Sequence, residues 1–123
     1  MSDDISKLPP HVQERLLRYQ QVQQTLQSVL AQKQQVDVEL TEIDQALAEL
    51  QKTADDATIY KSIGTLLVKG DKTKIIAELT ERKELLSTRT TVLGKQEERL
   101  RAQFRDLETK LKQDFNPVAS PQP

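Results

Sequence analysis

TIYKSIGTLLVK, residues 58–69, is a short apolar run near the middle of the chain. Its β-branched and aromatic residues favour β-strand, and the pair Gly64-Thr65 suits a two-residue hairpin loop. Glycine at the first loop position supplies the positive φ that a type II′ turn requires. We therefore predict a β-hairpin in which Ile63 lies opposite Leu66.

Both faces of this predicted hairpin carry apolar side chains, because residues alternate between the two faces of a strand. A lone two-stranded hairpin is marginally stable in water, and its open edges can pair with other chains. We predict that the hairpin is an oligomerisation element, formed by Ile59, Tyr60, Ile63, Gly64, Leu66, Leu67 and Val68.

Long apolar repeats flank the hairpin on both sides. Within each of two series, successive members are three or four residues apart, which is the signature of a coiled coil. The first series is Tyr19, Val22, Leu26, Val29, Lys33, Val36, Leu40, Ile43, Leu47 and Leu50. The second is Ile76, Leu79, Lys83, Leu86, Thr90, Leu93, Glu97, Leu100, Phe104, Leu107 and Leu111.

The chain order predicts a mainly α fold, an antiparallel two-helix coiled coil with a central β-hairpin. All five prolines lie before residue 11 or after residue 116, so proline interrupts neither repeat. We expect a flexible tail at 1–8, a first helix at 9–54, the hairpin element at 55–70, a second helix at 71–115 with Asp71 as its N-cap, and a disordered tail at 116–123.

Composition restricts the possible functions. With 30% charged residues, a net charge of -1 and 3% aromatics, the chain is suited to narrow seams and lacks the basic excess typical of nucleic-acid binding. It has no cysteine, its single histidine, His11, has no ligand cluster nearby, and its carboxylates follow the polar helix faces. We predict no enzyme activity, no metal or other cofactor, no membrane span, and, from the acidic polar start, a cytoplasmic location.

YKSIGTLLVK at 60–69, set between two long helices, resembles the beta subunits of the prefoldin family, of the archaeal type. The segments LPPHVQ at 8–13 and QEERL at 96–100 are similar to the same family, and the resemblance extends over about residues 8–115. It implies a heterohexameric holdase of two alpha and four beta subunits, whose hairpins assemble into a β-barrel platform. It also implies that nonnative polypeptides are captured at the coiled-coil tips and delivered to a group II chaperonin without nucleotide hydrolysis.

The ends of the two predicted helices carry more apolar residues than one seam can bury. The repeat also slips near Leu16 and Leu17, and helix ends next to tails should fray. We predict that nonnative clients bind here, through Leu8, Val12, Leu16, Leu17, Phe104, Leu107, Leu111 and Phe115. The alternative is that these residues only close the end of the coiled coil.

Some charged residues, one glycine and the function itself are not explained by the sequence in a single way. Lys33 and Glu97 interrupt the seams, and they either meet and fix the alignment or reach water separately. The lysines at 69, 72 and 74 indicate a solvated hairpin edge more than an anion site. Gly94 has no explanation beyond possible close packing. For function, the alternative to a chaperone is a structural coiled-coil adaptor that binds folded partners.

Overall fold

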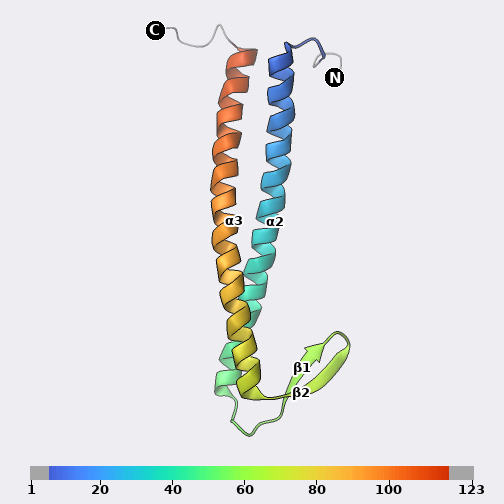
Figure 1. The fold of residues 1–123 in the computed structure, drawn as a ribbon, viewed down its shortest axis with the longest axis vertical. Helices are drawn as coiled ribbons and strands as arrows, with labels where there is room; N and C mark the ends of the chain where they lie inside the picture. Colours follow the sequence, from blue (N-terminus) through green and yellow to red (C-terminus); the bar gives the residue numbers. More distant parts are fainter. Residues whose placement is uncertain (1–5, 117–123) are drawn as a thin grey trace. The chain divides into compact units, whose positions relative to one another are not determined.

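The computed structural model describes residues 6–116 of the 123-residue chain (Figure 1). Its elements are helix α2 (Pro10–Lys52), strand β1 (Ile59–Ile63), strand β2 (Leu66–Gly70) and helix α3 (Lys72–Phe115). The predicted mainly α fold, two long helices with a hairpin between them, is confirmed. Most of the two expected tails, 1–5 and 117–123, lies outside the described residues.

Local chemistry accounts for where each helix begins. Pro10 is the first residue of α2, a position where a missing N–H is harmless, and the Pro9 carbonyl accepts from the amides of Val12 and Gln13. Asp71 caps α3, because its side chain accepts from the Thr73 amide at 3.3 Å. The α3 cap is therefore the one that the sequence predicted.

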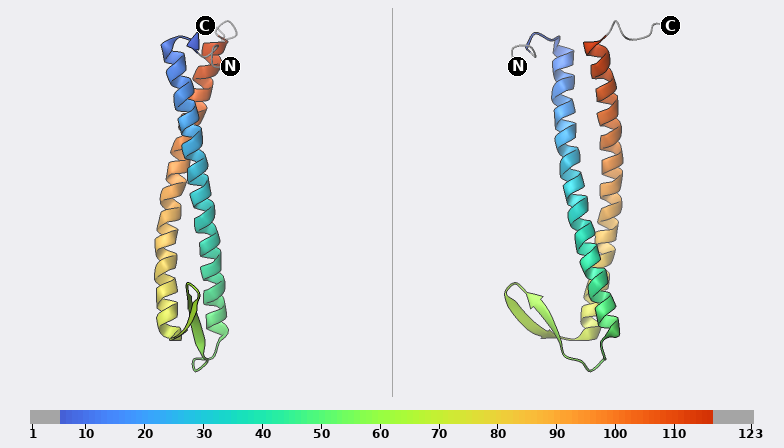
Figure 2. Two further views of the ribbon diagram at one scale, coloured as in Figure 1. Left: turned by 90° about the vertical axis from the view of Figure 1, so that its right-hand side faces the viewer. Right: turned by 180° about the vertical axis from the view of Figure 1, so that it is seen from behind.

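The described chain divides into two compact units, residues 6–32 with 93–116, and residues 33–92. In the first, the start of α2 and the end of α3 run antiparallel, side by side (blue and red in Figures 1 and 2). All of its buried apolar residues except Val12, which lies seven residues before Tyr19, occupy positions of the two predicted repeats: Val22, Leu26, Val29, Leu93, Leu107 and Leu111. The seam is thus built as the repeat indicates.

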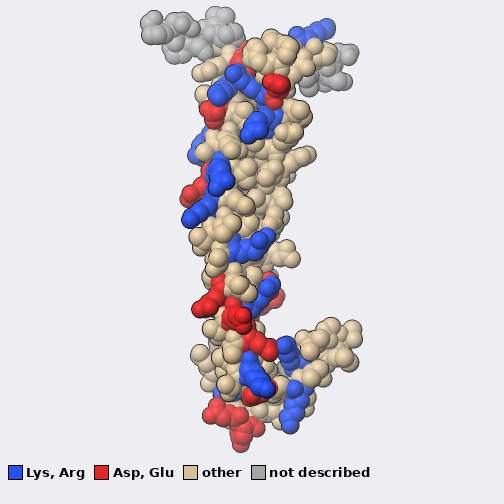
Figure 3. All heavy atoms as spheres, in the orientation of Figure 1, with Lys and Arg blue, Asp and Glu red and all other residues tan. Residues whose placement is uncertain are grey.

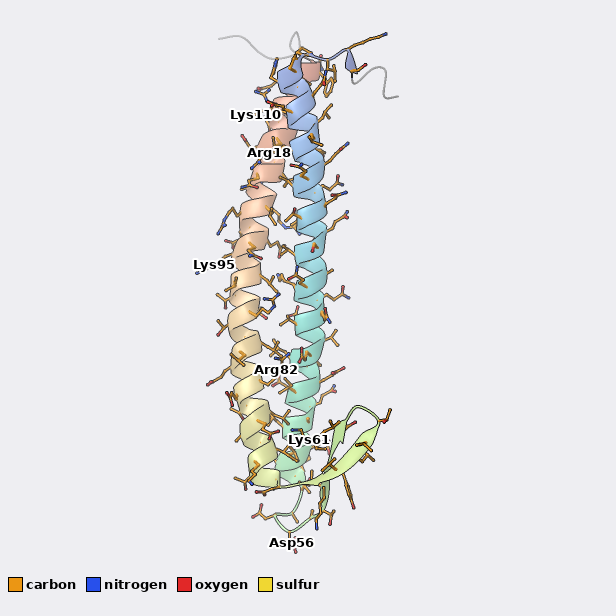
Figure 4. All side chains as sticks on the ribbon, turned by 45° about the vertical axis from the view of Figure 1, so that its right-hand side comes forward. Arg18, Asp56, Lys61, Arg82, Lys95 and Lys110 are labelled. Atoms are coloured by element: carbon orange, nitrogen blue, oxygen red, sulfur yellow. The ribbon has the colours of Figure 1, made fainter. Side chains whose placement is uncertain are left out.

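In the second unit, the end of α2 and the start of α3 bury Val36, Ile43 and Leu86, again at repeat positions. Two ion pairs border this seam: Arg82 with Glu39 at 2.9 Å and Lys83 with Asp44 at 2.7 Å. Arg82 extends from α3 toward α2 (Figure 4). Lys83, a charged residue inside the apolar repeat, is therefore accommodated by a carboxylate across the seam.

The hairpin has the register that the turn predicts. Ile63 pairs with Leu66, Lys61 with Val68, and the ladder continues to Ile59 and Gly70. Gly64 has a φ of 59°, and no non-glycine residue in the described chain has a positive φ. A positive φ at the first loop residue alone is the pattern of a type II′ turn, as expected.

None of the helices in residues 6–116 combines the length and apolar character needed to cross a membrane.

Candidate functional site

The hairpin leaves most of its apolar side chains in solvent. We define the hairpin surface as Tyr60, Ile63, Leu66, Leu67 and Val68, whose exposure runs from 44% at Val68 to 73% at Leu67. Figure 3 shows the outer part of the hairpin without Lys, Arg, Asp or Glu on the face in view. Exposed apolar side chains concentrated on two strands with open edges are the feature expected of an assembly surface.

This surface is two-sided. Alternation places Ile63, Leu66 and Val68 on one face, and Tyr60 and Leu67 on the other. Gly64, also predicted for assembly, forms the turn, and Ile59 is half-buried at the start of β1. The hairpin therefore has apolar side chains on each face for partners to cover.

One ion pair joins the hairpin to α3. The Lys61 ammonium lies 2.7 Å from the Glu78 carboxylate, and Lys61 is drawn between the strands and the helix in Figure 4. The helical spacing of Glu78 and Arg82 favours a mutual pair. Each instead binds another element, Glu78 the hairpin and Arg82 the facing helix, because those partners come closer in the folded unit.

The predicted client residues divide into buried and accessible groups. Val12, Leu107 and Leu111 are buried in the seam between the helix ends. Leu17 and Phe115 are exposed, at 58% and 54%. The remaining three are half-buried: Leu8, Leu16 and Phe104. We define the helix-end surface as Leu16, Leu17, Phe104 and Phe115.

Two contacts close the helix ends, and sequence reasoning missed both as contacts. Arg15 Nη1 donates to both oxygens of Asp114, each at 2.7 Å, and the Asp114 side chain is only 12% exposed. The rings of Tyr19 and Phe104 stack with centroids 4.5 Å apart. The Arg15–Asp114 pair could have been inferred from the sequence, because the two opposite charges lie near the outer ends of two antiparallel repeats.

Two of the grooves on the first unit lie at the helix ends. One, of about 450 Å³, is lined by Tyr19, Glu108, Leu111, Lys112, Phe115 and Asn116. The other, of about 460 Å³, is lined by Pro10, Gln13, Glu14, Leu16, Leu17 and Gln20. Both linings combine apolar with polar side chains, which suits apolar side chains of a partner chain.

Other candidate positions carry no comparable arrangement. His11 is exposed at the start of α2. Within residues 6–116, no group of three or more His, Cys, Asp or Glu side chains is placed to hold a metal ion. Glu97 accepts from Arg101 at 2.7 Å, one turn along its own helix. Its pairing with Lys33 stays a prediction.

Two long helices with an inserted, solvent-exposed hairpin define a coiled-coil protein with open β-strand edges. The family model described as "Prefoldin subunit" matches residues 13–117. The prefoldin subunit beta of Archaeoglobus fulgidus is 44% identical over 115 residues, covering 94% of this chain and 99% of that protein. That of Saccharolobus islandicus is 48% identical over 105 residues, covering 85% and 83%.

A solved structure supports the same assignment. The crystal structure of the prefoldin beta subunit from Thermococcus strain KS-1 has a TM-score of 0.77 and 40% identity, covering 94% of this chain and 98% of that one. The chain belongs to the prefoldin family, and within it to the beta subunits. It is therefore a subunit of a chaperone and assembles with other prefoldin subunits.

Proposed function

We propose that this subunit holds nonnative polypeptides on its helix-end surface and joins, through its hairpin surface, a heterohexamer of two alpha and four beta subunits. In this assembly the hairpins form a β-barrel platform. Clients pass to a group II chaperonin in the cytoplasm, and the subunit itself has no catalytic step and needs no cofactor.

The client-binding proposal rests on the exposure of Leu17 and Phe115. A holdase must accept many sequences, so it needs apolar surface that is open before the client arrives. The grooves beside these two residues offer such surface on both helices. Each contact can be weak, because several subunits engage one client and their effective concentrations multiply the affinity. The buried Val12, Leu107 and Leu111 support the surface from beneath.

The hairpin surface supports the assembly proposal. Leu67 at 73% and Leu66 at 65% exposed would leave an isolated subunit with apolar strands in water. Burying such side chains is worth about 1.5–3 kcal/mol each, which is ample to drive association when several hairpins meet. Strand edges would supply backbone hydrogen bonds between subunits.

The decisive experiment replaces Leu17 and Phe115 by serine in a hexamer formed with an alpha subunit. We expect the L17S/F115S hexamer to keep its mass and lose most of its suppression of aggregation of several unrelated denatured proteins. Leu85→Ser with Val92→Ser is the matched control, because these α3 residues are similarly exposed, at 60% and 48%, and lie outside both surfaces.

Two results would contradict the proposal. Full protection by L17S/F115S would place the client site elsewhere. Loss of binding to one folded protein, with no effect on denatured clients, would favour the adaptor function.

A further inference from the structure

The first residue of α3, Lys72, is unusual for its position. A helix N-terminus carries partial positive charge, so a cation there is unfavourable to its own helix. The side chain is nevertheless 14% exposed, whereas the lysines of five other ion pairs are 44–77% exposed: Lys52, Lys61, Lys83, Lys110 and Lys112. A lysine is withdrawn from water to this extent only where partners compensate its charge.

Those partners belong to the end of the other helix. Lys72 Nζ donates to the Thr53 carbonyl at 2.6 Å and lies 3.1 Å from the Asp55 carboxylate. Thr53 directly follows the last residue of α2, where carbonyl groups lack helical partners and the helix dipole is negative. The Lys72 ammonium is thus unfavourable at the N-terminus of α3 but favourable beside the C-terminus of α2.

The same contact fixes the connection into the hairpin. Residues 53–58 lead from α2 to β1, and Asp71 joins Gly70, the last residue of β2, to α3. Lys72 therefore ties the entry of the hairpin to its exit. At the exit, a Cβ on Gly70 would lie 2.5 Å from Ile75 Cδ1, so the backbone already packs closely against α3 there.

We propose that Lys72 is a positioning residue that fixes where the hairpin leaves the two helices, and thereby sets how tightly the subunit assembles with its partners. This inference rests on the proposed role of the hairpin surface in assembly. The Lys61–Glu78 ion pair, with both side chains about half exposed, acts as a second and weaker tether because solvent screens it.

The test compares Lys72→Met with Lys72→Arg in the full-length subunit, and uses Lys74→Met as the control. Lys74 is exposed in the same first turn of α3. We expect Lys72→Met to weaken assembly with an alpha subunit about tenfold, the equivalent of losing one charge-assisted hydrogen bond, with unchanged helical circular dichroism. Lys72→Arg should restore most of the affinity, and Lys74→Met should match the parent.

A distance measurement separates positioning from general destabilisation. The chain has no cysteine, so spin labels at Thr65→Cys and Glu81→Cys report specifically on the hairpin relative to α3. We expect the label distance distribution to broaden in Lys72→Met and to stay narrow in Lys72→Arg. An unchanged distribution, or a broadened one with unchanged assembly affinity, would overturn the inference.

A reference variant keeps this outcome distinct from failure of the proposed function. If Leu66→Asp with Val68→Asp abolishes assembly while Lys72→Met assembles normally, only the role of Lys72 is wrong. If the double aspartate variant assembles normally, the hairpin surface is not the assembly site. The label distances then still decide whether Lys72 positions the hairpin, and its proposed effect on assembly is refuted.

Discussion

The hairpin and the helix ends are both rich in apolar residues, but they differ in how far these residues are exposed to solvent. Four of the five residues of the hairpin surface are more than half exposed. At the helix ends, Val12, Leu107 and Leu111 are buried, and an ion pair and a ring stack join the two helices. Within residues 6–116, no element covers the hairpin surface, whereas the two helix ends cover each other.

This difference separates two uses of apolar surface. The hairpin surface consists of five exposed apolar side chains on strands with open edges, which fits permanent assembly. The helix-end surface consists of a few apolar side chains that remain accessible beside a buried seam, which fits weak and reversible contact with many clients. The four predictions below test this contrast, from the largest expected effect to the smallest.

Leu66→Asp with Val68→Asp should abolish assembly with an alpha subunit. Two carboxylates on one face of the hairpin would have to be buried without partners, which costs several kcal/mol. Light scattering should show unassembled subunits whose circular dichroism remains helical. Leu85→Asp with Val92→Asp is the matched control and should assemble normally. A hexamer from the hairpin variant would remove the distinction between the two regions.

Leu111→Ala and Leu67→Ala should differ strongly in the isolated subunit. Leu111 is 7% exposed, so truncation should lower the free energy of unfolding by about 2–4 kcal/mol. Leu67 is 73% exposed, so its truncation should change stability by less than about 0.5 kcal/mol. Urea titrations followed by circular dichroism give both values. Equal effects would show that the helix ends are not closed as described.

Arg15→Met should destabilise the helix ends by about 1–2 kcal/mol, because the mostly buried Asp114 carboxylate loses a charged partner. The urea midpoint should fall, and binding of an apolar dye should rise as the seam opens. Arg18→Met, at an exposed position on α2, serves as the control and should leave both readouts unchanged. An Arg15 variant as stable as the parent would mean that the stacked rings and the seam suffice.

Gly94→Ala and Gly64→Ala should have small effects of opposite sign. A Cβ on Gly94 meets no atom within 4 Å, so alanine should stabilise α3 by up to about 1 kcal/mol. Gly64 has a φ of 59°, where alanine costs about 1 kcal/mol. Thermal unfolding of the two variants measures both. Loss of stability in Gly94→Ala would show that the glycine serves close packing after all.

Much of this arrangement could be predicted from the sequence, because it depends on local periodicity. Apart from Val12, every buried seam residue in the described chain, from Val22 to Leu111, lies at a position of the predicted 3.5-residue repeats. The glycine of the turn fixed the strand register, since a two-residue loop leaves one pairing for Ile63 and Leu66. Asp71 could be recognised as a cap from its place before the second repeat.

The contacts between distant residues could not be predicted in this way. Helical spacing suggested that Glu78 would pair with Arg82, but spatial neighbours from other elements displaced both partners. The sequence indicated that Lys72 is a solvated lysine at the hairpin edge. In the structure its Nζ lies 2.6 Å from the Thr53 carbonyl at the end of α2. Leu107 and Leu111, two of the predicted client residues, occupy repeat positions and are buried, but periodicity did not show that Leu17 and Phe115 remain more than half exposed.

The sequence by itself therefore determined the elements, the seams, the hairpin register and the family resemblance, because each depends on residues close together along the chain. Only the tertiary structure decided which charges meet and which apolar side chains stay in water. Those outcomes depend on which residues become neighbours after the helices pair, and many charged residues compete for each partner. A residue such as Arg15 acquires its role only when Asp114 reaches it.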